Sequence, residues 1–213
     1  MLPTPDNLQR WGKRQVSKCP LCSNKGTLEH ILNFCSIALN QGRTKWRHDS
    51  VLNFLTKSIL TGKPESLEVF ADLPGLDLNV FTIPPDILPT QQRPDLVIVD
   101  RNRKTIFVLE LTVSFERNFE AANARKTARY TALKSDLEER GYQCHLIPFE
   151  VGSRGYVSKS NRLNLINVFV MNKLKPNAYK IIKQMSKISL LCSYSIFHAY
   201  TQPTWRDPPF LEP

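Results

Sequence analysis

Two apolar, β-branched segments separated by a short polar stretch place the strongest limit on the fold. Residues 96–99 and 106–113 flank Arg101-Asn102-Arg103-Lys104, a pattern typical of a β-hairpin. A two-residue and a four-residue loop give the same register, in which Asp95 lies opposite Glu110. Opposed side chains share one face of a sheet. A three-residue loop or a bulge would separate the two carboxyl groups.

The opposed carboxylates of Asp95 and Glu110 indicate a cation between them. Two negative groups held face to face repel each other, and hard oxygen ligands of this kind suit Mg²⁺ or Mn²⁺. Alternatively, Asp95 caps a turn after Pro94 and Glu110 is an exposed strand residue. Glu110 interrupts an otherwise apolar run, IFVLELTV, and this favours the metal site.

Residues 118–140 show the clearest helical pattern in the chain. Tyr130 and Leu133 belong to its apolar stripe, and Lys126 lies on the same line one turn earlier. A lysine on the core-facing side needs a negative partner, which the carboxylates would supply. The alternative is a lysine that extends past the edge of the stripe into water. Arg129, about one turn further on, could reach the same phosphate or hold the nucleic-acid backbone.

Four potential metal ligands are concentrated near the N-terminus. Cys19-Pro20-Leu21-Cys22 is followed after seven residues by His30 and after four more by Cys35. Three thiolates and one imidazole form a tetrahedral set that suits structural Zn²⁺. A separation of five residues is long for one helical face, so the predicted helix at 28–38 should end or loosen near Cys35. Ligation would supply most of this unit's folding free energy.

The charge distribution favours an anionic partner. The 213-residue chain has a formal net charge of +10. No acidic residue occurs between Glu150 and Asp207, whereas many basic residues do. A solvated basic surface is the alternative, but a run this long favours nucleic acid. The basic residues of this run are Arg154, Lys159, Arg162, Lys173, Lys175, Lys180, Lys183, Lys187 and Arg206.

Membrane and secretory features are not expected. No apolar run reaches the length of a membrane span, and the N-terminal segment has no apolar core. We therefore expect a chain that is not secreted, with its five cysteines in a reducing compartment.

The remaining segments complete the predicted architecture. We expect an irregular basic arm at 1–18 with Trp11 as an anchor, and a helix at 44–60 on which His48 is more typical of a surface or capping residue than of a catalyst. A proline-rich connector follows, with a strand near 78–83 that lies beside the sheet. We also predict a central strand at 142–151. The turn at 152–155 either contacts phosphate or is a plain turn. Helices at 159–174 and 177–199 should cover the sheet, and the tail from 201 should be irregular.

The ordered series of motifs resembles a known family. Cys-x2-Cys-x7-His-x4-Cys, Arg47-His48-Asp49, Arg93-Pro94-Asp95 with Glu110-Leu111-Thr112, and Lys126-x2-Arg129-Tyr130 are similar to the C-terminal end of site-specific non-LTR retrotransposon polyproteins. That end carries a CCHC zinc knuckle and a restriction-like endonuclease of the PD-(D/E)xK type. The resemblance spans roughly residues 17–206 and extends to residues 150–156 and Trp205.

The resemblance implies an α/β (α+β) fold with a restriction-endonuclease-like mixed sheet flanked by helices and a small N-terminal zinc module. It divides the chain into an arm and knuckle (1–42), a helix and connector (43–92), an endonuclease-like core (93–200) and a tail (201–213). Asp95 and Glu110 would hold Mg²⁺ or Mn²⁺, and Lys126 would replace the lysine usually found where this chain has Thr112. Arg129 takes the place of a second lysine.

The function implied is metal-dependent nicking of target DNA for retrotransposition, with DNA and element RNA as partners in the nucleus or nucleocytoplasm. A Tyr-x-Asp-Asp motif is absent, so reverse transcription is not predicted. The alternative is a catalytically dead or host-adopted remnant that only binds nucleic acid. The predicted nucleic-acid-binding residues are Arg47, His48, Arg93, Arg129, Arg154, Lys159 and Arg162.

Overall fold

A mixed sheet lies at the centre of the computed structural model, which describes residues 1–73 and 82–210. Within these residues the sheet has four strands in the order β1 (Leu67–Ala71), β2 (Leu96–Asp100), β3 (Thr105–Ser114) and β4 (Gln143–Gly152). The first three strands are antiparallel, and β4 runs parallel to β3. The predicted α/β class with a mixed sheet flanked by helices is confirmed.

The β2–β3 hairpin has the predicted register. Leu96 pairs with Leu109 and Asp100 pairs with Thr105, so the next pair outward is Asp95 with Glu110. The backbone N–H of Asp95 donates a hydrogen bond to Glu110 Oε1 at 3.2 Å, which joins the two residues across the strand end.

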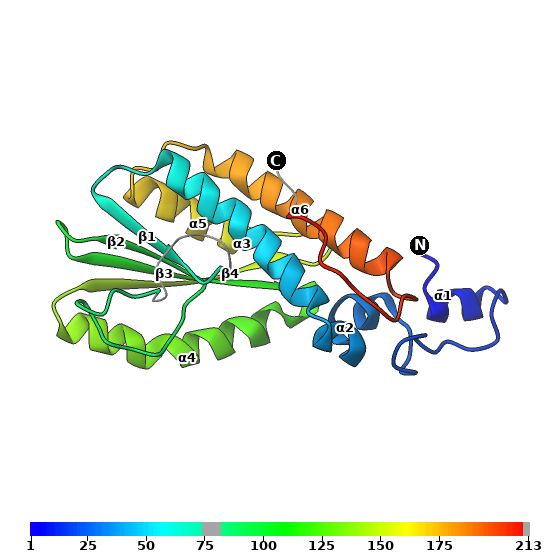
Figure 1. The fold of residues 1–213 in the computed structure, drawn as a ribbon. Helices are drawn as coiled ribbons and strands as arrows, with labels where there is room; N and C mark the ends of the chain where they lie inside the picture. The colour runs from blue at the N-terminus through cyan, green and yellow to red at the C-terminus, as the bar shows by residue number, and fades with distance from the viewer. Residues whose placement is uncertain (74–81, 211–213) are drawn as a thin grey trace.

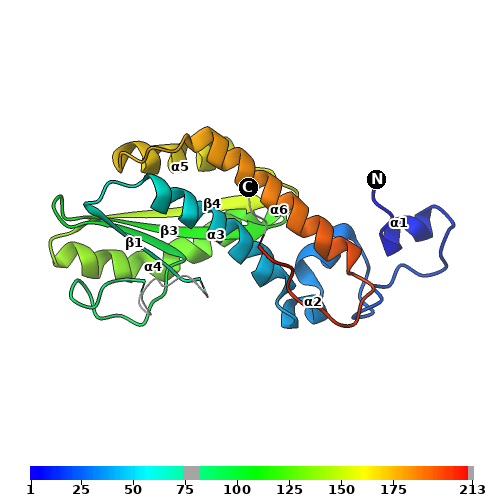
Figure 2. The ribbon, with the colours of Figure 1, turned by 45° about the horizontal axis from the view of Figure 1, so that its top comes forward.

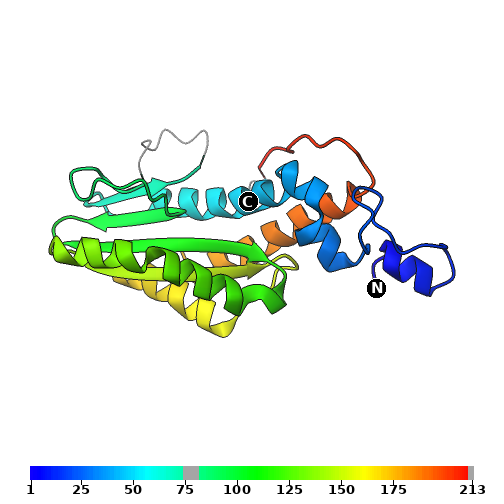
Figure 3. The same cartoon turned by 90° about the horizontal axis from the view of Figure 1, so that it is seen from below.

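Helices cover both faces of the sheet (Figure 1). On one face lies α4 (Phe119–Glu139), whose apolar side chains pack on alternate strand residues such as Val97 and Val108. On the other face lie α3 (Arg43–Gly62), α5 (Lys159–Met171) and α6 (Ala178–His198). Figure 3, seen from below, places α4 alone in front of the sheet. Because side chains alternate between the two faces of each strand, the sheet contributes to two hydrophobic cores, one on each face.

Two strand predictions need correction. Residues 142–151 do form a strand, β4, but it pairs only with β3 among the described strands and lies at the sheet edge rather than in the centre. The connector does supply the first strand, as β1 at Leu67–Ala71. The predicted strand at 78–83 falls mainly on 78–81, outside the described residues, and Thr82 and Ile83 form no strand.

The N-terminal region is more ordered than predicted. The expected irregular arm contains a short helix, α1 (Pro5–Arg10), whose first N–H groups are capped by the Thr4 side chain. Trp11 is 42% exposed and does not anchor the arm. In Figure 2 this segment extends from one end of the molecule.

The predicted helix at 28–38 is interrupted near Cys35, as the spacing between His30 and Cys35 indicated. A π-helical segment, His30–Phe34, ends at Cys35, which has an extended backbone, and α2 (Ser36–Asn40) follows. The prediction of a break near Cys35 is confirmed. At the other terminus the tail is irregular, as predicted, and lies against α3, where Trp46 Nε1 donates to Pro208 O at 2.8 Å.

No described helix has the length and apolar character needed to span a membrane.

Candidate functional site

A cluster of polar groups forms where β3 continues past the start of β2. Because β2 begins at Leu96, the paired register stops there, and side chains satisfy the next peptide groups of β3. The N–H of Leu111 donates to Asp95 Oδ2 at 2.8 Å, and His48 Nε2 lies 3.2 Å from Leu111 O. The site is thus assembled from β2, β3 and α3.

Lys126 of α4 completes this cluster. Its ammonium nitrogen lies 2.5 Å from Glu110 Oε2, 3.0 Å from Asp95 Oδ2 and 2.5 Å from Leu111 O. Only 2% of the Glu110 side chain is exposed, so the positive charge offsets a carboxylate that water barely reaches. The predicted meeting of the two carboxylates with Lys126 is therefore found in the structure.

His48 also joins the site, although the sequence pattern favoured a surface or capping position. Its Nδ1 lies 2.9 Å from Asp49 Oδ1, and its Nε2 lies 3.4 Å from Asp95 Oδ2. A signal was present in the sequence: His48 precedes Leu52 by four residues and Leu55 by seven, which places it on the buried side of α3. Asp49 holds the imidazole so that its other nitrogen faces the carboxylate.

The pKa values of the two carboxyl groups shift in opposite directions. Burial by itself raises the pKa of Asp95, but the hydrogen bond and charge of His48, with the charge of Lys126, hold it well below its usual range. Burial and then the charge of Asp95 raise the pKa of Glu110, against the opposing effect of Lys126. Burial lowers the pKa of His48, but Asp49 and Asp95 outweigh it and raise the pKa to about 9. Asp95 is therefore an anion at neutral pH.

The donor set of this site fits a divalent cation. Asp95 Oδ2, Glu110 Oε2 and Leu111 O are hard oxygen ligands, and they already surround one positive nitrogen. Mg²⁺ and Mn²⁺ prefer carboxylate and carbonyl oxygens arranged in this way. Binding such an ion would require the Lys126 ammonium to move aside.

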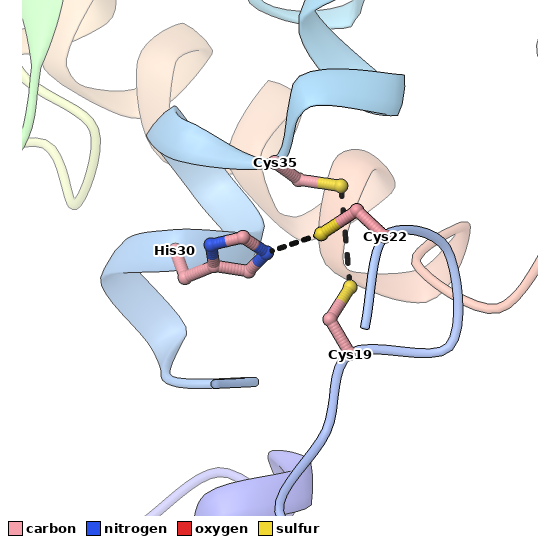
Figure 4. Close-up of side chains that lie close together, drawn as sticks. All are labelled: Cys19, Cys22, His30 and Cys35. Atoms are coloured by element: carbon pink, nitrogen blue, oxygen red, sulfur yellow. Dashed lines mark hydrogen bonds between the residues drawn. The ribbon is translucent and has the colours of Figure 1, made fainter. Parts of the chain in front are cut away.

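Cys19, Cys22, His30 and Cys35 form a second candidate metal centre (Figure 4). Their ligand atoms all lie within 4.8 Å of one another, with Cys19 Sγ 3.9 Å from Cys35 Sγ and Cys22 Sγ 3.0 Å from His30 Nε2. Tetrahedral zinc with Zn–S near 2.3 Å separates its ligands by about 3.5–3.8 Å. This donor set fits Zn²⁺, as the sequence spacing predicted.

The local fold explains how these ligands meet. The N–H of Cys19 donates to Asn24 O at 2.7 Å, and the N–H of Ser23 donates to Cys19 O at 3.0 Å, which closes a tight turn around the first two thiols. Within the described residues, the apolar cluster around the thiols is small, with Cys19, Cys35 and Ala38 as its buried members, while Ile31 and Leu32 of the same region are buried in the main core. A bound metal would add to the stability of this region.

Arg47 does not fit its predicted contact with nucleic acid. The residue is fully buried, and its guanidinium donates to Leu32 O at 3.1 Å, Asn33 Oδ1 at 2.9 Å and Val113 O at 3.1 Å. These partners belong to β3 and to the segment that carries the four candidate zinc ligands, residues 19–40, which we call the Cys/His module. Arg47 therefore joins the candidate zinc module to the strand that carries Glu110.

The other predicted nucleic-acid-binding residues lie on the surface but not in one place. Arg93 pairs with Asp72 at 2.5 Å, and Arg129 is exposed on α4. Arg154 pairs with Glu116 at 2.7 Å, and Lys159 and Arg162 are exposed on α5. Most of the long basic run lies on α5 and α6, in the layer opposite α4 (Figure 1), so that run does not surround the carboxylates.

A cleft of about 300 Å³ lies beside the carboxylate site and was not predicted. Its walls include Asn33 from the Cys/His module, Thr112 from β3 and Arg125 from α4. Thr112 follows Leu111 and Arg125 precedes Lys126 in the sequence, so the cleft is lined by neighbours of the carboxylate site.

Comparisons with known proteins add little. No protein-family model matches the chain, and no curated protein matches it. Among the solved structures that match is one described as an N-terminal domain of a reptarenavirus L protein, with 12% sequence identity, coverage of 78% of this chain and 96% of that chain, and a TM-score of 0.37. A likeness at this level supports no functional argument.

Proposed function

We propose that this chain is a divalent-metal-dependent DNA endonuclease. One observation carries the proposal: a lysine ammonium lies within 3.0 Å of two buried or half-buried carboxylates, Asp95 and Glu110, at the end of a hairpin. A cation-binding carboxylate pair with an adjacent lysine is suited to phosphodiester hydrolysis, in which negative charge develops on the phosphate.

The residues of the site divide the chemistry between them. Asp95, Glu110 and the carbonyl of Leu111 would hold Mg²⁺ or Mn²⁺, which supplies an activated water and polarises the scissile phosphate. Lys126 would orient that water or stabilise the charge of the phosphorane-like transition state. His48, held by Asp49, keeps the Asp95 carboxylate in position.

The family resemblance supplies the finer part of the proposal. On that analogy the product is a nick whose 3′-hydroxyl primes reverse transcription in the nucleus, and the Cys/His module binds Zn²⁺ and positions DNA or template RNA. Arg93, Arg129, Arg154, Lys159 and Arg162 are the exposed basic residues we assign to nucleic-acid contact. Electrostatic contacts of this kind bind strongly without sequence preference and weaken as salt increases.

Nicking of supercoiled plasmid tests the activity. The native protein should nick DNA with Mg²⁺ and stop when the divalent ion is omitted, whereas Glu110→Gln should be inactive. Extension of the nicked product by a DNA polymerase reports the 3′-hydroxyl. Equal nicking by the native protein and Glu110→Gln would exclude this site as the source of cleavage.

A second candidate function is nucleic-acid binding without cleavage. Two observations favour it: Thr112 occupies the usual lysine position, and Lys126 itself fills the space between the carboxylates. This function predicts a gel shift that survives Asp95→Ala and Glu110→Ala and is lost on zinc chelation, together with no nicking by the native protein.

A further inference from the structure

The stretch 150–156 folds around a pocket that the proposed nuclease chemistry does not use. It leaves β4 through a tight turn in which Gly155 has a φ of +83°, a conformation that favours glycine. Gly152 lies against the Glu116 side chain. The N–H of Gly152 donates to Tyr156 O at 2.7 Å, and Ser186 Oγ donates to Gly155 O. This turn lets the residues at its two ends line one cavity.

The pocket has a volume of about 750 Å³ and lies between the start of α4, the end of β4 and the start of α5. The Phe119 and Tyr156 rings lie nearly parallel, at 21°, with centroids 6.3 Å apart. Tyr156 is 55% exposed, so most of its ring is open to a ligand. Exposed aromatic faces beside a polar pocket are how proteins stack unpaired bases. The lining of the pocket includes Phe119, Asn123, Glu150, Tyr156, Asn161 and Asn164.

Glu150 supplies a buried acceptor in this pocket. The residue is 4% exposed, its Oε1 accepts one hydrogen bond, from Asn123 Nδ2 at 3.0 Å, and no ion pair to it is found within the described part of the chain. An ionised carboxylate has about four acceptor positions. Asn123 fills one of these positions, so Glu150 can accept further N–H groups from a ligand in the pocket that it lines.

The pocket adjoins the carboxylate site. Glu150 pairs with Thr112 in the sheet, two positions beyond Glu110 on the face covered by α4. Asn123 precedes Lys126 by three residues on that helix. From the sheet spacings, Glu110 and Glu150 are about 8 Å apart between Cα atoms. A strand whose phosphate lies at Lys126 would therefore carry a neighbouring base to the pocket.

We propose that this pocket binds one unpaired nucleobase of single-stranded DNA or RNA. The base stacks on Tyr156 and donates from its exocyclic amino group to Glu150, so cytosine is favoured over thymine or uracil, which lack that group. The inference rests on the proposed function in one respect only: the strand whose base enters the pocket is the same strand that the carboxylates would cleave.

Fluorescence anisotropy with labelled oligodeoxycytidylate and oligothymidylate, without added divalent metal, tests the inference. Tyr156→Ala should weaken oligodeoxycytidylate binding at least about five-fold, and Tyr156→Phe should restore it, because stacking needs only the ring. Glu150→Gln should reduce the preference for cytosine over thymine by about five-fold or more. The matched control is Tyr179→Ala, a 67% exposed tyrosine at the start of α6 that does not line the pocket.

Equal binding by the native protein and Tyr156→Ala, or an equal loss in Tyr179→Ala, would overturn the inference. So would a native protein that binds the two oligonucleotides equally. Oligocytidylate, measured in parallel, distinguishes RNA from DNA as the source of the base. Repeating the series in an Asp95→Asn protein separates this result from cleavage: base-dependent binding without nicking by the native protein contradicts the endonuclease alone, and nicking without base-dependent binding contradicts the pocket alone.

Discussion

Lys126 lies where a divalent cation would have to bind. Its ammonium contacts Glu110 Oε2, Asp95 Oδ2 and Leu111 O, and 20% of its side chain is exposed. A divalent cation bound to these oxygens would therefore compete with the lysine, and the displaced ammonium would be free to approach a phosphate.

Lys126→Met should bind Mn²⁺ about ten-fold more tightly than the native protein, equivalent to about 1.4 kcal/mol. The substitution leaves two carboxylates repelling each other with no counter-charge, and a metal ion relieves that repulsion. Isothermal titration calorimetry measures the affinity. Lys134→Met, at a more exposed lysine of the same helix, is the control and should bind like the native protein. Unchanged or weaker binding by Lys126→Met would show that the ammonium does not occupy the metal position.

The positions of individual side chains were predicted well where a regular sequence pattern determined them. They were predicted poorly where tertiary packing determined them. The four candidate zinc ligands and the Asp95–Glu110–Lys126 group follow from spacing and from strand and helix periods. Arg47 and His48 were assigned to nucleic-acid contact because three consecutive polar residues on a helix do not indicate which segment packs against them. In the structure the end of β3, left unpaired by β2, accepts hydrogen bonds from both side chains.

The β2–β3 hairpin is the element on which the site depends, and its turn is held by Asp100. The carboxylate accepts from the Arg103 N–H at 2.9 Å and from Arg103 Nε at 2.5 Å. Burial opposes ionisation of Asp100, but these donors outweigh it and lower its pKa. Lys104 closes the turn with a φ of +48°.

Asp100→Asn should lower the free energy of unfolding by about 1 kcal/mol at neutral pH. A carboxyl group whose pKa is lowered by folding contributes stability above its unfolded pKa and loses it as pH falls through the folded value. The difference between Asp100→Asn and the native protein should therefore shrink below about pH 4. Urea unfolding of both proteins at neutral and acid pH measures it. A difference that is constant with pH would assign the effect to something other than the charge.

Sequence patterns predicted the hairpin register because a two-residue and a four-residue loop have the same parity, and the structure has a four-residue loop. They could not give the position of β4, since a strand covered on both faces by helices has the same apolar composition at an edge as in the centre. In the structure α4 packs on one face of β4 and α5 and α6 pack on the other. β1 was missed because its five residues contain one β-branched side chain, Val69, and lie in a proline-rich connector.

Across the molecule, the Cys/His module is joined to the rest of the protein by Arg47 and also by Ile31 and Leu32, which are buried in the main hydrophobic core. Leu32 O and Asn33 Oδ1, which Arg47 contacts, belong to the segment that carries His30 and Cys35. Loss of the metal would therefore disturb the α3 end of the carboxylate site as well as the module itself.

Zinc removal should be visible in thiol reactivity. Of the five cysteines, Cys19, Cys22 and Cys35 belong to the candidate zinc site, whereas Cys144 and Cys192 are buried and burial raises the pKa of each to about 11. In the zinc-loaded protein all five should react slowly with a thiol reagent. A chelator should expose three, and a denaturant the remaining two. Rapid reaction of Cys19, Cys22 and Cys35 in the metal-loaded protein would contradict zinc ligation.

The basic run shows that a charge pattern in the sequence does not indicate which surface of the whole molecule the charges occupy. The acid-free basic run was predicted to contact nucleic acid, and its helices α5 and α6 lie on the opposite side of the sheet from α4 (Figure 3). Only three-dimensional packing decides which layer each helix joins. On the α4 side, nucleic acid at the carboxylates would meet Arg125 and Arg129, whereas Lys159 and Arg162 would contact it beyond the edge strand β4, at the start of α5.

The most direct test of the carboxylate site is the Mg²⁺-dependent nicking rate of two matched variants of the hairpin. Asp95→Asn and Asp100→Asn make the same chemical change at the two ends of β2, one within the candidate site and one in the turn. Catalysis by this site predicts loss of nicking in Asp95→Asn and a near-native rate in Asp100→Asn at a temperature where both remain folded. Equal rates in Asp95→Asn and the native protein would contradict it.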